Sequence, residues 1–285
     1  MTASILLVLL VSLAWPVSFG AGYPASGQEI ASAANPGLAT KETVLSEEEF
    51  REFLKTAQVV ASKQTAKGIT APVKLTLSDG QRTIEASFQS VEIFRPRTVH
   101  PSYVELEFRD SFKFNIASYQ LAKLLDLGNM IPVTVEYRWN GKKGSLSLWV
   151  PAKWDEEDRL KLSLQPPDES AWNKQMNRMW VFSQLVYDTD RNQTNMLITE
   201  DWKLWMIDFT RAFRLETDLK DSERLVTCDR QLLAKLRKLD GAQVLETTKA
   251  HLQKKEVKAL MARRDLIVAH FERLIAEKGE EKVLY

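Results

Sequence analysis

Cysteine is nearly absent from this chain. Cys228 is the only cysteine among 285 residues, so no intrachain disulfide can form. The sequence contains no HExxH motif and no cluster of cysteine and histidine, which leaves zinc chemistry without support. Cys228 precedes Asp229 in a polar stretch, a setting that favours the start of a helix over a nucleophile.

The sequence also lacks an excess of charge of either sign. It has 39 lysines and arginines against 38 acidic residues, a formal net charge of +1. A nucleic-acid-binding protein usually carries a strongly basic face, so we expect no nucleic-acid partner. The apolar and charged fractions are those of an ordinary globular protein, which argues against disorder.

No apolar run has a comfortable length for crossing a bilayer. Residues 4–15, SILLVLLVSLAW, form an apolar stretch that is followed by small residues as far as Gly22. We predict a cleaved signal peptide over residues 1–22 and a linker over 23–45. The protein is then secreted or periplasmic, with no stable membrane span after cleavage. The alternatives are a buried N-terminal helix or an uncleaved anchor, because no lysine or arginine precedes the run.

The most informative stretch is LVYDTDRNQTNMLITEDWKLWMIDFTRAFR, residues 185–214. It contains two short apolar runs, 196–198 and 204–207, separated by a polar turn, which predicts a β-hairpin. The hairpin would bring Asn195, before its first strand, beside Asp208, after its second. Asp190 lies on the loop that leads into the hairpin.

These three side chains suit phosphoryl transfer. Oxygen ligands such as those of Asn195 and Asp208 can hold Mg²⁺ together with the phosphates of a substrate. A carboxylate at Asp190 can orient an attacking hydroxyl or accept its proton. We therefore assign Asn195 and Asp208 as metal ligands and Asp190 as the catalytic residue.

The segment resembles the catalytic core of the atypical protein-kinase-like superfamily. Asp190-Arg191 is similar to the start of the catalytic loop in phosphoinositide kinases and in secretory-pathway kinases of the casein and xylosyl kinase type. The run from Ile207 to Phe213 is similar to their metal-binding strand end, and FNIASYQLAKLL, residues 114–125, to their small-lobe helix. The resemblance implies ATP and Mg²⁺ or Mn²⁺ as cofactors and a protein or carbohydrate acceptor. Because this chain has a single cysteine, it fits a bacterial relative of these kinases better than a relative that is held together by disulfides.

The periodicity along the chain predicts an α+β, bilobal, kinase-like fold. The predicted smaller lobe, residues 46–150, has a helix over 46–62, alternating strands near 73–77, 83–88 and 103–108, a helix over 112–126 capped by Asp110, and a hairpin within 133–150. The predicted larger, catalytic lobe, residues 151–285, is mainly helical. Its helices are expected over 170–187, 229–238, 242–253 and 255–277.

The usual phosphate-binding pair of kinases, a strand lysine and a helix glutamate, is missing from the expected positions. Gln89 follows the strand 83–88, and the helix has Asn115 where the glutamate is expected. A glycine-rich phosphate loop is also missing, and we assign Gly80 to a hairpin turn. Arg109 and Lys113 are candidates for nucleotide contact, with solvated surface charge as the alternative.

Arg191 and Arg211 flank the two acidic positions and are further candidates for phosphate contact. Structural ion pairs with Asp188 or Asp218 are the alternative for these two arginines.

Three hypotheses follow for the whole protein. The first is a metal- and ATP-dependent phosphotransferase. The second is a pseudokinase that binds nucleotide or metal without turnover. The third is a cell-surface binding module stabilised by a cation such as Ca²⁺.

Overall fold

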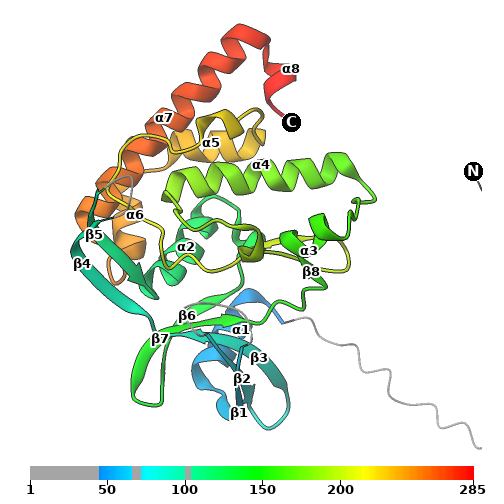
Figure 1. The fold of residues 1–285 in the computed structure, drawn as a ribbon, viewed down its shortest axis with the longest axis vertical. Coiled ribbons are helices and arrows are strands. Elements are labelled where there is room, and N and C mark those ends of the chain that lie inside the picture. Colours follow the sequence, from blue (N-terminus) through cyan, green and yellow to red (C-terminus); the bar gives the residue numbers. More distant parts are fainter. Residues whose placement is uncertain (1–44, 66–71, 100–103) are drawn as a thin grey trace, which may run out of the picture. The chain divides into compact units, whose positions relative to one another are not determined.

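A computed structural model describes residues 45–65, 72–99 and 104–285 of the protein. The predicted signal peptide, residues 1–22, and nearly all of the predicted linker, residues 23–45, lie outside these ranges. No helix in the described ranges is long and apolar enough to cross a membrane. The described residues form a small antiparallel sheet and a mainly helical part, which confirms the predicted α+β class (Figure 1).

The small sheet has five antiparallel strands in the order β1-β2-β3-β7-β6. Their bounds are Gln58–Gln64 for β1, Val73–Ser78 for β2, Thr83–Gln89 for β3, Thr134–Trp139 for β6 and Lys142–Leu148 for β7. Because side chains alternate along a strand, Leu75, Leu77 and Phe88 point to the same covered face. They pack there with Phe53 and Leu54 of the first helix, α1.

Helix α1, Glu47–Thr56, is shorter than predicted. The capping box at Ser46 and Glu49 is present, so the predicted start is correct. The predicted continuation to residue 62 is wrong, because residues 58–64 form the edge strand β1 and pair with β2. Pairing with a neighbouring strand outweighed the local helical pattern.

Two predicted hairpin turns are confirmed. Asn140 and Gly141 join β6 to β7 with positive φ values of 47° and 74°, as a tight two-residue turn requires. Gly80, with φ of 88°, lies in the turn between β2 and β3. The position of Gly80 therefore agrees with its assignment to a hairpin.

A two-stranded ribbon lies between β3 and the next helix. Its strands are β4, Glu92–Val99, and β5, Val104–Ser111. The sequence predicted a strand near β5 but missed β4, where Pro96 and two arginines obscure the alternation. Within the described residues the ribbon pairs with no other sheet (Figure 1). Its side chains Phe94 and Leu106 are exposed.

Helix α2, Lys113–Leu124, follows the ribbon directly. The predicted cap was wrong: Phe112 precedes the helix without a side-chain cap, and Asp110 contacts Arg211 instead. Phe114, Leu121 and neighbouring side chains join the large hydrophobic core of the helical part. Helix α2 thus connects the small-sheet region to the helical part.

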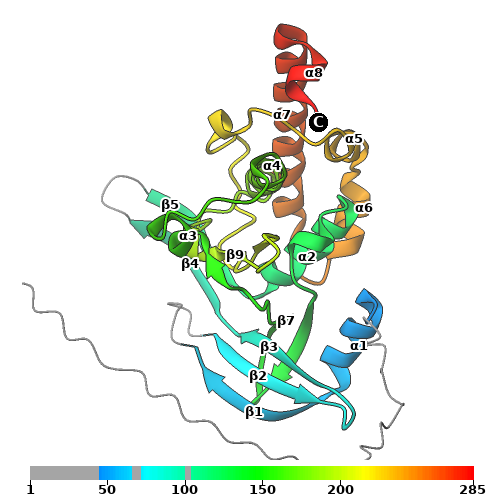
Figure 2. The same ribbon diagram turned by 90° about the vertical axis from the view of Figure 1, so that its right-hand side faces the viewer.

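The mainly helical part contains the remaining elements. The helices are α3 Glu156–Lys161, α4 Glu169–Val186, α5 Arg230–Lys238, α6 Gly241–Thr248, α7 Lys254–Lys278 and α8 Glu280–Val283. A three-stranded sheet is formed by β8 Trp154–Asp155, β9 Met196–Ile198 and β10 Leu204–Met206. Figure 2 shows α4 and α7 side by side, and the two helices pack against each other. The domain boundary predicted after residue 150 falls between β7 and β8 and stays a prediction.

Candidate active site

The loop after α4 holds Asp190 and Asn195 together. Tyr187 ends α4 in a left-handed conformation, with φ of 49°, and turns the chain away from the helix. The Asn195 side-chain Nδ2 donates a hydrogen bond to the main-chain oxygen of Asp190 over 2.9 Å. Asn192 Nδ2 donates to the Asp190 carboxylate over 3.1 Å. The Asp190 side chain is 42% exposed, so it is accessible to a substrate.

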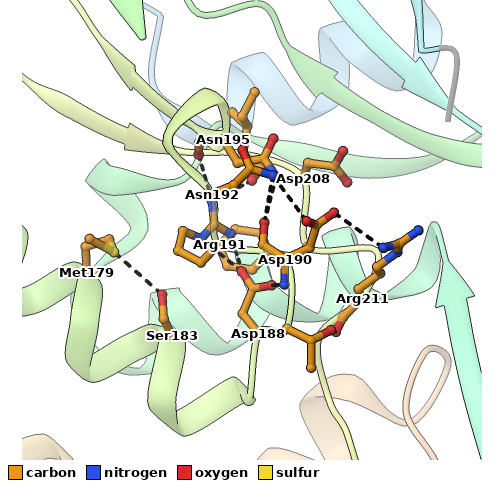
Figure 3. Close-up of polar contacts among 12 residues, drawn as sticks. Met179, Ser183, Asp188, Asp190, Arg191, Asn192, Asn195, Asp208 and Arg211 are labelled. Carbon is orange, nitrogen blue, oxygen red and sulfur yellow. Dashed lines mark hydrogen bonds and ion pairs between the residues drawn. The ribbon is translucent and has the colours of Figure 1, made fainter. Parts of the chain in front are cut away.

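The predicted hairpin is present and places Asp208 next to this loop. β9 and β10 pair antiparallel, with Met196 opposite Met206. One step further along, Ile207 N donates to Asn195 O over 3.1 Å. Figure 3 shows Asp190, Asn195 and Asp208 gathered at this end of the hairpin. The three residues selected from the sequence therefore lie together.

A buried ion pair holds the loop between α4 and β9 in place. Arg191 contacts Asp188 over 2.6 Å, and their side chains are 3% and 0% exposed. Arg191 also donates 2.7 Å hydrogen bonds to the main-chain oxygens of Asn195 and Ile207. Asp188 in turn accepts from the main-chain N of Asp190 over 3.0 Å. Arg191 is thus bound within the protein, as the structural alternative expected.

Arg211 links the ribbon to the loop. It donates to Asp110 at the end of β5 over 3.1 Å and lies 3.9 Å from the Asp190 carboxylate. A main-chain hydrogen bond from Ser111 to Thr210, 2.8 Å long, holds the same junction. The partner of Arg211 is therefore Asp110 rather than the Asp218 considered from the sequence. Because the Arg211 side chain is 35% exposed and reaches Asp190, it remains a candidate for phosphate contact.

Asp208 has the properties of a cation ligand. Its backbone is left-handed, with φ of 55°, a conformation that aspartate adopts more readily than most residues. Burial raises the pKa of its carboxyl, although a hydrogen bond from Thr210 opposes this shift. No lysine or arginine forms an ion pair with Asp208 among the described residues.

The chemistry of the donor set fits a divalent metal. Since Asn195 uses its Nδ2 on Asp190, its Oδ1 is the atom left for a cation. With Asp208 it supplies the hard oxygen ligands that Mg²⁺ and Mn²⁺ prefer. No group of three or more histidine, cysteine or acidic side chains with metal-binding geometry occurs in the described ranges. A metal here would need further oxygens from a substrate.

A neutral hydrogen-bond network occupies the place expected for the lysine–glutamate pair. Asn115 Nδ2 donates to Gln89 Oε1 over 2.6 Å and to Ser145 Oγ over 3.0 Å. Asn115 Oδ1 accepts from Phe209 N over 2.7 Å, and the Gln89 side chain hydrogen-bonds to Asp208. The sequence identified Gln89 and Asn115 as departures from the kinase pattern, but it did not predict the hydrogen bond between them.

Gly144 allows β7 to pack closely against β3 beside this network. A Cβ atom at Gly144 would lie 2.3 Å from the main-chain oxygen of Gln89 and 2.6 Å from the Phe88 ring. Such distances are not tolerated, so only glycine allows β7 to pack here without moving β3.

The other two candidates for nucleotide contact are in ion pairs. Arg109 pairs with the buried carboxylate of Glu256 on α7, and its side chain is 14% exposed. Lys113 lies 3.2 Å from Glu92 of β4. The Lys113 side chain is 35% exposed, which agrees with the solvated surface charge considered as the alternative, whereas Arg109 is mostly buried. Their predicted role in binding nucleotide stays untested.

Comparison with known proteins identifies the fold. No protein-family model and no curated protein matches the sequence. Among solved structures, a hydra Fam20 with sugar is similar at a TM-score of 0.62 and 15% identity, over 85% of this chain and 94% of that chain. The Golgi casein kinase with Mn/ADP bound gives 0.60 and 12%, over 84% and 78%. The Helicobacter pylori proinflammatory kinase CtkA gives 0.50 and 11%, over 79% and 98%. The chain thus has the fold of the atypical kinase-like proteins, as its catalytic segment predicted.

Proposed function

We propose that this protein is a phosphotransferase that uses ATP and a divalent cation, Mg²⁺ or Mn²⁺. The observation that carries the proposal is the meeting of Asp190, Asn195 and Asp208 at one end of the β9–β10 hairpin. The kinase-like fold and the neighbouring structure with Mn/ADP bound add support. Asn195 and Asp208 would hold the metal, which when bound neutralises charge on the phosphates.

The protein side chains then position the acceptor. The exposed Asp190 carboxylate can orient an acceptor hydroxyl and receive its proton. Asn192 and Arg211 fix the direction of that carboxylate. Arg191 and Asp188 hold the backbone of the loop, so this geometry exists before a substrate binds.

The acceptor that we propose is a hydroxyl group of a protein or a carbohydrate. The similar structures are described as a casein kinase and as a Fam20 with sugar, which makes these two acceptor classes the first to test.

Wild-type protein should bind ATP only when Mg²⁺ or Mn²⁺ is present, and it should transfer the γ-phosphate to an acceptor. Isothermal calorimetry with and without metal measures the first step, and radiolabel transfer to casein or to a xylose-containing oligosaccharide measures the second. The structural-cation hypothesis makes a different prediction. If Ca²⁺ raises the thermal stability of the protein and ATP does not, the cation-stabilised binding module is favoured over the phosphotransferase.

One observation favours the pseudokinase as a second candidate. Gln89 and Asn115 are neutral, so these two positions offer the phosphates no lysine–glutamate pair. Phosphate binding would then depend on the metal and on Arg211. A site of this kind can bind nucleotide weakly and turn it over slowly or not at all.

Restoring the charged pair tests whether phosphate approaches Gln89. Because Gln89 and Asn115 already touch, Gln89→Lys with Asn115→Glu should form an ion pair beside Asp208. We expect the double variant to bind ATP about tenfold more tightly, a charge-assisted contact with phosphate being worth roughly 1.5–3 kcal/mol. Calorimetry checks the affinity, with Gln89→Lys alone as the control. Unchanged ATP affinity in a folded double variant would mean that phosphate does not approach Gln89.

We also propose that the protein is exported. The support is the apolar run at residues 4–15 followed by small residues, all outside the described ranges. N-terminal sequencing of protein expressed in a bacterial host should give a mature start between Ala21 and Gln28. An intact Met1 in the cytoplasmic fraction would refute export.

A further inference from the structure

The ribbon of β4 and β5 exposes apolar side chains that no other part of the described chain covers. Between 38% and 69% exposed are Ile93, Phe94, Val99, Val104 and Leu106. The two strands contact each other far more than they contact any other element. Figure 2 shows the ribbon extending away from α6 and α7. Single exposed apolar residues are common on proteins, but a group of them gathered on one protruding element marks an interaction site.

One face of the ribbon combines apolar and cationic side chains. Residues that are paired across an antiparallel ribbon lie on the same face, and so do alternate residues of one strand. Three register pairs share this face: Arg95 with Phe108, Arg97 with Leu106 and Val99 with Val104. The guanidinium carbon of Arg95 lies 5.8 Å from the centre of the Phe108 ring. Two arginines therefore lie beside three exposed aliphatic side chains.

The two arginines on this face carry uncompensated charge. Both are exposed, and neither Arg95 nor Arg97 forms an ion pair within the described ranges. Of the acidic residues in β5 that precede Arg109, Glu107 pairs with Lys255 of α7, and Glu105 is not in register with either arginine. This face is therefore cationic and complements an anionic surface.

The placement of the apolar residues favours a lipid surface over a protein partner. Phe94 precedes Arg95 directly, so it lies on the opposite face of the ribbon, where it is 58% exposed. A folded partner that docks on a two-stranded ribbon covers one face, whereas a lipid layer surrounds an element that enters it. Pairing of β4 with a strand of a second copy is disfavoured, because Pro96 lacks the main-chain donor that edge pairing uses.

We propose that the β4–β5 ribbon docks the protein on an anionic lipid bilayer. The aliphatic side chains Val99, Val104 and Leu106 enter the interfacial region, where the burial of apolar surface stabilises binding. Arg95 and Arg97 contact the lipid phosphates. Each arginine near an anionic membrane surface strengthens binding by about fivefold.

Docking by this ribbon also brings the candidate active site close to the bilayer. Asp110, near the end of β5, accepts a hydrogen bond from Arg211 over 3.1 Å. Arg211 lies 3.9 Å from the Asp190 carboxylate. An acceptor hydroxyl at the membrane surface would then be within reach of the site. Lipid binding itself does not depend on the proposed phosphotransferase activity.

Sedimentation with lipid vesicles tests the docking on the full chain, without nucleotide. We expect binding to vesicles of phosphatidylcholine with phosphatidylglycerol, and much weaker binding to phosphatidylcholine alone. Arg95→Ser with Arg97→Ser should weaken binding to the anionic vesicles by about thirtyfold, the product of the two arginine contributions. Arg237→Ser with Arg273→Ser changes the net charge equally at exposed positions of α5 and α7 and should have no comparable effect.

Leu106→Ser tests the apolar contribution without a change of charge. It should weaken binding to the anionic vesicles by about tenfold, because a largely exposed leucine no longer enters the lipid. Leu266→Ser, at a 43% exposed position of α7, is the matched control and should leave the affinity unchanged.

A fluorophore on the ribbon gives a signal that the apolar run at residues 4–15 cannot produce. Cys228 is fully buried, so a polarity-sensitive maleimide dye added to the Val99→Cys variant attaches at position 99. Its emission should shift to shorter wavelength with the anionic vesicles. The same dye on Val226→Cys, at a 54% exposed position before α5, should show no shift.

Two results would overturn the proposal. One is an unshifted emission at position 99 in the presence of the anionic vesicles, and the other is an equal loss of vesicle binding in the two double-arginine variants. A dimer that forms with rising concentration and that Leu106→Ser dissociates, without any vesicle binding, would replace the lipid surface with a second copy of the chain.

Discussion

Asp208→Asn is expected to abolish metal-dependent ATP binding and phosphate transfer together. The substitution removes the charge that would hold the metal, and the metal contacts the phosphates both before and during transfer. Asparagine keeps the size of the side chain and tolerates the left-handed backbone at this position, so the fold should persist. Calorimetry measures the binding and radiolabel transfer measures the turnover.

Asp190→Ala should separate binding from turnover. This carboxylate is placed to act on the acceptor, so ATP affinity should stay nearly intact while transfer falls by roughly two or more orders of magnitude. The two variants are therefore matched, since each removes one carboxylate from the same cluster. Equal loss of ATP affinity and transfer rate in Asp190→Ala would exclude the role given to Asp190.

Arg191→Met is expected to cause the largest loss of stability among single substitutions near the site. It leaves the Asp188 carboxylate, which is 0% exposed, without its partner, and it removes hydrogen bonds to Asn195 O and Ile207 O. Breaking a buried ion pair in this way typically costs about 3–5 kcal/mol. Urea denaturation followed by circular dichroism measures the change in the free energy of unfolding.

The exposed ion pair between Arg230 and Glu280 offers a matched control. Its side chains are 48% and 52% exposed, so Arg230→Ala should cost less than about 1 kcal/mol. Adding Asp188→Asn to Arg191→Met should recover part of the loss, because it removes the unpaired buried charge. A cost for Arg191→Met no greater than that of Arg230→Ala would contradict the structural role given to the Asp188–Arg191 pair.

Local sequence patterns predicted the elements around the site well. Hairpin pairing depends on short-range alternation and turn chemistry, and so the β9–β10 hairpin and the adjacency of Asn195 and Asp208 followed from residues 185–214 alone. The long helices α4 and α7 were predicted within about two residues by their apolar spacing.

Partners distant in the sequence could not be predicted in the same way. Asp110 was expected to cap α2 but pairs with Arg211, 101 residues away. Residues 58–64 continued a helical pattern, and only the presence of β2 makes them a strand. The contact of Gln89 with Asn115 likewise depends on how β3 lies against α2. Each of these outcomes is decided by tertiary packing, which a single local window does not contain.

Arg263, a fully buried residue of α7, has a consequence for the order in which the protein acquires its structure. Its guanidinium donates to the main-chain oxygens of Leu185, Arg214 and Glu216, which lie 78, 49 and 47 residues earlier in the chain. A ribosome releases the chain from its N-terminus, so the end of α4 and the segment that follows the candidate site emerge well before the residue that ties them together. Until α7 has emerged and docked, these carbonyl groups remain without their native donor. The small sheet can therefore form during translation, whereas the site acquires its final geometry only near the end of synthesis.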